Sequence, residues 1–173
     1  TGDPNEEGGA YQRALGVLYG FSYTVKMAKM GDWQPEGYFD YVVPPLEGLW
    51  WAGSGAFDGA SIADKGALSW VSLIRQPDFV TPEAFERACG MMVAKKPEFA
   101  DAVEEGELRL VRFAEGPCAQ IMHRGPYDDE PATIARLSDF ISAQGLASDI
   151  AEGGESPAGH RATKAFDPAA MLD

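Results

Sequence analysis

Residues 2–7 read Gly-Asp-Pro-Asn-Glu-Glu, and residues 125–130 read Gly-Pro-Tyr-Asp-Asp-Glu. Both segments combine a turn glycine, a proline and acidic residues directly before an amphipathic run, a pattern typical of a helix start. Each helix leads on to a candidate strand, and the second copy also follows a candidate strand that ends at His123. The repeat of this pattern predicts an α+β fold duplicated about a pseudo-twofold axis, with the first strand missing before Thr1.

The spacing of apolar residues, together with capping residues, glycines and prolines, predicts the remaining elements. Apolar residues at helical spacing predict a helix over residues 9–29, and Thr81 before Pro82 predicts a second helix that ends near Lys95. A third helix is predicted from Asp128 or Asp129 to just before Gly145. Aromatic, β-branched or alternating runs bounded by Gly or Pro predict strands over residues 38–43, 46–51, 68–75, 107–113 and 117–123.

Composition limits the class of partner. The 173 residues favour one domain over residues 1–173, and the formal net charge of -13 argues against a nucleic-acid or anionic-membrane partner. A cationic or neutral small molecule is easier to accommodate. No apolar run approaches the length of a membrane span and the first residues do not resemble a signal peptide, so we expect a cytoplasmic protein.

Glu47 is the first candidate for chemistry, because it interrupts an otherwise apolar strand. A carboxylate among apolar neighbours must be paired, hydrogen-bonded or raised in pKa, which suits it to bind a cation or to act as a general acid or base. The alternative is an alternating strand in which Glu47 faces water.

Aromatic residues around Glu47 are candidates for binding a flat ligand by stacking. Trp50 and Trp51 are adjacent, so in a strand they point to opposite faces and only one of them can line a given pocket. The alternative for each is packing in the core. The aromatic ligand-binding candidates are Phe39, Tyr41, Trp50, Trp51 and Trp70.

His123 and Tyr127 flank the Gly125-Pro126 turn. A histidine there could donate a proton or orient a carboxylate, or it could simply bond to backbone. Tyr127 could offer a hydroxyl or pack against the helix start. The spacing of the two histidines and two cysteines does not suggest a metal site, and no cofactor is expected.

Five motifs in one order carry a resemblance to a known family. They are residues 2–5, Gly-Asp-Pro-Asn; residues 45–51, Pro-Leu-Glu-Gly-Leu-Trp-Trp; residues 75–80, Arg-Gln-Pro-Asp-Phe-Val; residues 115–123, Glu-Gly-Pro-Cys-Ala-Gln-Ile-Met-His; and residues 125–131, Gly-Pro-Tyr-Asp-Asp-Glu-Pro. The chain resembles the GyrI-like small-molecule-binding family, specifically its stand-alone branch. The resemblance implies two fused βαββ-type units, a mainly antiparallel sheet with helices on one face, and a central ligand cleft.

The resemblance also implies two activities, multidrug binding and hydrolytic opening of the cyclopropane in DNA-alkylating antibiotics. One departure weakens the second. The family's last strand carries a cleft glutamate at the position that Ala162 occupies here, so that carboxylate cannot be carried over.

These observations predict a protein that binds a flat, apolar or cationic drug or xenobiotic in an aromatic cleft with a buried carboxylate, for antibiotic resistance or sequestration. Glu47, His123 and Tyr127 are the catalytic candidates, and position 162 belongs to the ligand site. The alternative is a cyclopropanoid cyclopropyl hydrolase. The oligomeric state is left open.

Overall fold

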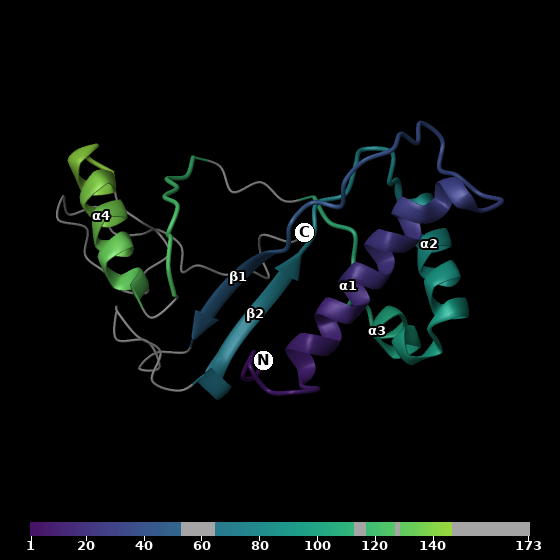
Figure 1. The fold of residues 1–173 in the computed structure, drawn as a ribbon, viewed down its shortest axis with the longest axis horizontal. Helices are drawn as coiled ribbons and strands as arrows, with labels where there is room; N and C mark the ends of the chain where they lie inside the picture. The colour runs from purple at the N-terminus through teal and green to yellow at the C-terminus, as the bar shows by residue number, and fades with distance from the viewer. Residues whose placement is uncertain (53–64, 113–116, 127–128, 147–173) are drawn as a thin grey trace. The chain divides into compact units, whose positions relative to one another are not determined.

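The computed structural model describes residues 1–52, 65–112, 117–126 and 129–146 (Figure 1). The chain divides into two compact units, Thr1–Gly53 with Asp64–Leu110, and Ser54–Ala63 with Val111–Asp173. A single domain over residues 1–173 stays a prediction.

The first unit contains most of the regular structure. Figure 1 shows α1 lying between the β1–β2 pair and α2. The elements of this unit are α1 (Ala10–Lys26), η1 (Met27–Met30), β1 (Glu47–Ala52), η2 (Lys65–Ala67), β2 (Leu68–Leu73), α2 (Pro82–Lys95), η3 (Pro97–Phe99) and α3 (Ala100–Glu104).

Strands β1 and β2 form an antiparallel pair in which Glu47 lies opposite Leu73 and Trp50 lies opposite Trp70. The N-terminal segment meets the same sheet, because the Gly2 N–H donates to the Leu68 carbonyl at 2.9 Å. Gly2 has φ 132°, a conformation that glycine adopts without steric cost. The described part of the chain is therefore α+β, with helices and a small antiparallel sheet.

The hydrophobic core of this unit lies among α1, α2, α3 and the segments beside them. Burial of these side chains is the main force that holds the helices together. The buried cluster comprises Val17, Phe21, Val25, Phe79, Val80, Ala88, Cys89, Met92, Phe99, Ala102 and Leu108. Burial raises the pKa of the Cys89 thiol to about 11, so Cys89 acts as a small core residue, whereas Cys118 is exposed.

The predicted helices and two of the predicted strands are confirmed. Thr81 caps α2 by accepting a hydrogen bond from the Ala84 N–H at 3.3 Å, and Pro82 occupies the first helical position. Strands β1 and β2 fall within the predicted ranges 46–51 and 68–75 to within one residue. Local sequence signals are strong at these places because a cap or an alternating run needs no distant partner.

The strand predicted over residues 38–43 is wrong. The segment is held by side chains instead of a ladder. Tyr38 and Tyr41 pack against the buried Phe79 with ring centroids 5.2 and 5.8 Å away, and Asp40 pairs with Lys26 and with Lys29. This aromatic run has the sequence pattern of a strand. In the structure it is an extended segment that side-chain contacts hold against the end of α1.

The paired strands predicted over residues 107–113 and 117–123 are also not found among their described residues. Leu108 is buried in the core of the first unit, and its N–H donates to the Ala102 carbonyl at 3.0 Å. The start of this segment therefore closes the end of α3 instead of entering a sheet.

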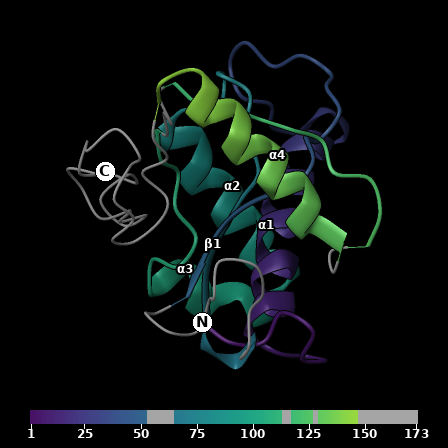
Figure 2. The same cartoon turned by 90° about the vertical axis from the view of Figure 1, so that its left-hand side faces the viewer.

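The second unit contains α4 (Glu130–Ala143), and Figures 1 and 2 both show the extended segment 117–126 beside it. Asp129 is the N-cap residue and Gly145 has φ 69° just beyond the helix, as the sequence predicts. Gly125 has φ 137°, close to the 132° of Gly2. The two turn glycines thus have similar φ values, although the turn before α1 is longer than the turn before α4.

None of the helices in the described residues is both long and apolar enough to cross a lipid bilayer.

Candidate functional site

The two faces of the β1–β2 pair carry different chemistry. Trp50 and Trp70 are directly opposite each other, and the Tyr11 ring of α1 contacts both of them, with centroid distances of 5.1 Å in each case. This face therefore points toward α1. Tyr11 was not among the sequence candidates. The signal that could have found it is its place among the apolar residues at helical spacing in α1.

Gly48 explains how Trp50 packs. A Cβ atom at position 48 would lie 2.6 Å from the Trp50 Nε1 atom, so the indole ring folds back over the glycine. The packing alternative therefore accounts for Trp50 and Trp70, and their ligand-binding role stays a prediction.

The opposite face carries Glu47. Because successive residues of a strand alternate between faces, positions 47 and 49 lie on the side of β1 away from Trp50, and their partners Leu73 and Val71 lie on the same side of β2. Leu49, Val71 and Leu73 are half-buried and Glu47 is exposed. The face is an apolar strip with one carboxylate at its end.

The expectation of a buried carboxylate is wrong in this structure. Glu47 is the first residue of β1, and its side chain is exposed. The sequence pattern places a carboxylate among apolar residues, but it cannot tell which side of the strand is covered.

Phe39 and Tyr41 lie on the segment clamped against Phe79. Phe39 is 56% exposed and its ring lies 6.3 Å from that of Tyr41. Burial raises the pKa of Tyr41 to about 12, and its hydroxyl points toward the Ser22 carbonyl at 3.5 Å. Tyr41 therefore stays protonated at neutral pH and supports the segment.

His123 uses both ring nitrogens within the second unit. Its Nε2 lies 2.9 Å from the Pro126 carbonyl oxygen and its Nδ1 lies 2.9 Å from the Thr133 hydroxyl. A carbonyl only accepts, so Nε2 donates to Pro126, while the Thr133 hydroxyl can either donate to Nδ1 or accept from it. This geometry matches the backbone-bonded alternative and ties the turn before α4 to the helix.

Three sequence candidates lie outside what the structure describes. They are Tyr127, Ala162 and the side chain of Trp51, whose backbone pairs with Ser69. Among the described residues, the structure brings Trp50 together with Trp70 and Phe39 together with Tyr41. Glu47 lies on a different face of the sheet from the two tryptophans. Within those residues no three His, Cys, Asp or Glu side chains form a metal-binding group.

Solved structures from Listeria innocua are similar to this chain over most of its length. A hydrolase is 42% identical with a TM-score of 0.68, covering 83% of this chain and 67% of the other. A hydrolase encoded by lin2189 is 42% identical with a TM-score of 0.73, covering 90% and 70%. The chain belongs to the family of these Listeria proteins.

A further member, an uncharacterized conserved protein from Listeria innocua, is 46% identical with a TM-score of 0.72, covering 84% of this chain and 66% of that protein. The chain thus spans about two thirds of the length of each of these relatives. No protein-family model matches the chain, and no curated protein matches it.

Proposed function

We propose that this protein is a hydrolase of a flat, apolar small molecule, and that the Glu47 face of the β1–β2 pair forms part of its binding site. The observation that carries the proposal is the identity of 42% to two Listeria proteins that are named hydrolases. The strip of Leu49, Val71 and Leu73 beside one carboxylate supports it, because an apolar substrate binds to an apolar surface and a carboxylate can take a proton from the attacking water.

The alternation of side chains along β1 also predicts an aromatic residue on the same face as Glu47. Position 51 is two residues beyond position 49, so the alternation predicts that Trp51 shares the face of Glu47. A tryptophan there would stack on a planar ligand and exclude water from one side of it. The adjacent Trp50 would then remain a packing residue.

The GyrI-like resemblance suggests the substrate class, a cyclopropane-bearing DNA alkylator. In the proposed step the oxygen of water bonds to a cyclopropane carbon while a ring C–C bond breaks. The electron pair of that bond passes into the conjugated carbonyl, whose oxygen takes a proton from an acid, and Glu47 takes the proton of the attacking water. The described residues supply the base, and the acid is left unassigned.

The second candidate function is binding without turnover, for sequestration of the same compounds. Ala162 favours it, because the family's cleft glutamate is replaced there by a side chain that cannot transfer a proton. Position 162 lies outside the described residues, so this candidate rests on the sequence.

The deciding experiment incubates the protein with a cyclopropane-fused DNA alkylator and follows the product with one added water by mass spectrometry. We expect turnover, and we expect Glu47→Gln to slow it by about 10²- to 10⁴-fold, the usual contribution of a positioned general base. Glu36→Gln is the matched control, since Glu36 is an exposed carboxylate in the loop after α1. Equal rates in both variants would remove Glu47 from the mechanism.

Binding without turnover is the result expected from the second candidate. In that case Ala162→Glu should restore a positioned carboxylate and raise single-turnover hydrolysis by about 10²-fold, near the lower end for such a group. Rapid hydrolysis by the unmodified protein would instead exclude a function limited to sequestration.

A further inference from the structure

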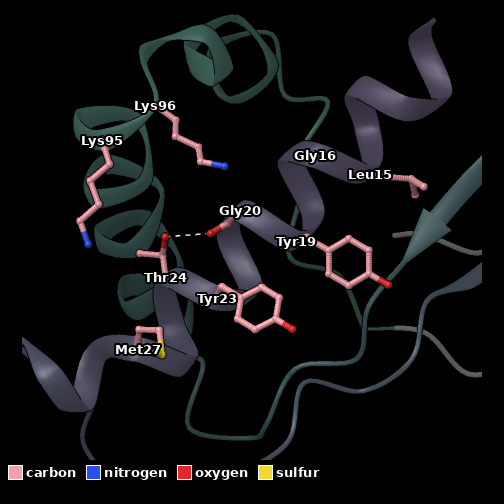
Figure 3. Close-up of a pocket in the computed structure, with 9 residues that line it drawn as sticks. All are labelled: Leu15, Gly16, Tyr19, Gly20, Tyr23, Thr24, Met27, Lys95 and Lys96. Carbon is pink, nitrogen blue, oxygen red and sulfur yellow. Dashed lines mark hydrogen bonds between the residues drawn. The ribbon is translucent and has the colours of Figure 1, made fainter. Parts of the chain in front are cut away.

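A groove lies on the first unit, and none of the residues that line it belongs to a strand. It has a volume of about 510 Å³, and its lining residues come from α1, from the first residue of η1, and from the last residue of α2 and the residue that follows it. This volume lies in the range of about 300 to 1,000 Å³ usual for small-molecule sites. Its lining comprises Leu15, Gly16, Tyr19, Gly20, Tyr23, Thr24, Met27, Lys95 and Lys96 (Figure 3).

The α1 side of the groove is aromatic and apolar. The rings of Tyr19 and Tyr23 are stacked with centroids 6.3 Å apart and an interplanar angle of 29°. Figure 3 shows the two rings side by side on one side of α1. Tyr23 is 53% exposed and Met27 is 44% exposed, on a helix face where polar side chains are the rule.

The Thr24 hydroxyl on this side of the groove already has a hydrogen-bond partner within α1. The Thr24 hydroxyl donates to the Gly20 carbonyl at 2.8 Å, the bond drawn in Figure 3, so it has no proton left to donate to a ligand. A ligand on this side of the groove meets mainly apolar surface, together with the hydroxyl groups of Tyr19 and Tyr23.

The α2 side is positively charged. Lys95 and Lys96 are exposed, and neither forms an ion pair with any described residue. The Lys96 ammonium group lies 5.1 Å from the centroid of the Phe99 ring, which holds it beside the groove. Two full positive charges outweigh the partial negative charge of about one half at the C-terminus of α2.

Charge complementarity selects the ligand. The chain carries a net charge of -13, yet none of the residues that line this groove is Asp or Glu. A cation finds no counter-charge there, whereas an anion finds two unpaired ammonium groups. The stacked tyrosines add a flat surface for an aromatic ring.

We propose that this groove binds a small aromatic carboxylate, with its ring against Tyr19 and Tyr23 and its carboxylate toward Lys95 and Lys96. The site is distinct from the Glu47 face, because none of its lining residues belongs to β1 or β2. Its ligand therefore differs in charge from the cationic or neutral ligand expected at a carboxylate.

The experiment uses the whole protein and three probes of the same shape: naphthoate, its neutral amide and the naphthylmethylammonium cation. Calorimetry should show naphthoate binding more tightly than the other two. Lys95→Gln should weaken naphthoate by about three-fold, the size of an exposed charge contact, and leave the amide unchanged. Lys65→Gln is the matched control, since it removes the same charge from an exposed residue outside the groove.

The position of the probe is read from isotope-labelled methionine methyl groups by NMR. The Met27 methyl should shift when naphthoate binds, and the exposed Met122 methyl should not. Lys96→Gln provides a second variant at the same rim. Equal affinity for the three probes, equal loss in Lys65→Gln, or binding without a Met27 shift would each overturn the proposal.

Discussion

The side chain of Asp40 helps to hold residues 38–41, a segment that forms no strand. Its carboxylate accepts hydrogen bonds from Lys26 and from Lys29, which lie at and just beyond the end of α1. Lys26 also donates to the Tyr41 carbonyl, and the Tyr38 hydroxyl donates to the Lys26 carbonyl at 2.7 Å. These contacts keep residues 38–41 against Phe79 without the backbone hydrogen bonds of a β ladder.

Acid should release this segment. The hydrogen bonds from Lys26 and Lys29 lower the pKa of Asp40 from 3.8 to about 2. A lowered carboxyl pKa stabilises the folded state above 3.8, and this contribution is lost as the pH falls from there to about 2. We expect the difference in unfolding free energy between the natural chain and Asp40→Asn to shrink over this interval.

Chemical denaturation at several pH values measures that difference. Asp32→Asn is the control, because Asp32 is an exposed carboxyl in the preceding turn with no ion pair among the described contacts. A pH-independent difference for Asp40→Asn would show that the ion pair does not hold the segment.

At the scale of elements, the contact between α1 and the η3 turn depends on two glycines. A Cβ atom at Gly20 would lie 3.1 Å from the Phe99 Cε2 atom and 3.2 Å from the Met92 sulfur, and one at Gly16 would lie 3.4 Å from the Phe99 ring. Phe99 and Met92 are both buried, so neither can move aside easily. Small residues at these positions let the Phe99 ring pack directly on α1.

Gly20→Ala and Gly90→Ala should therefore have opposite effects on stability. Gly90 lies within α2 with nothing within 4 Å of its added Cβ atom, so alanine there should raise the unfolding free energy by about 0.5 to 1 kcal/mol. At Gly20 the same propensity gain is offset by overpacking of roughly 1 to 3 kcal/mol. Urea unfolding of both variants tests the contact, and a gain of similar size in both would refute it.

At the scale of the whole molecule, each of the two units has a glycine of positive φ before a long helix. Gly2 and Gly125 have φ values of 132° and 137°, each a few residues before a long amphipathic helix. This agreement is more specific than the shared residue types, since such a φ is disfavoured for a residue with a side chain. The duplicated unit stays a prediction.

If the two units are duplicates, the same substitution should have the same effect in both. Gly2→Ala and Gly125→Ala should each lower the unfolding free energy by about 1 kcal/mol or more, because alanine is strained at both φ values. Thermal unfolding of the two variants provides the measurement. If alanine were tolerated at one position and costly at the other, the two turns would not be equivalent.

Helix ends and the ranges of β1 and β2 followed from local sequence, as Thr81 before α2 and Gly145 after α4 illustrate for the helices. A capping side chain or a left-handed glycine acts on its own neighbours, so its effect is visible within a few residues. The alternation of residues 47–51 likewise showed that Trp50 and Trp51 belong to opposite faces. The net charge of -13 also followed from composition alone.

The remaining features depended on contacts between distant residues. Tyr11 on α1 establishes which face of β1 is covered, and this leaves Glu47 on the exposed face. The packing of residues 38–41 against Phe79, and the groove between Tyr23 and Lys95, also join segments far apart in the chain. An alternating pattern distinguishes two faces but does not say what covers either of them, because that depends on where other elements pack.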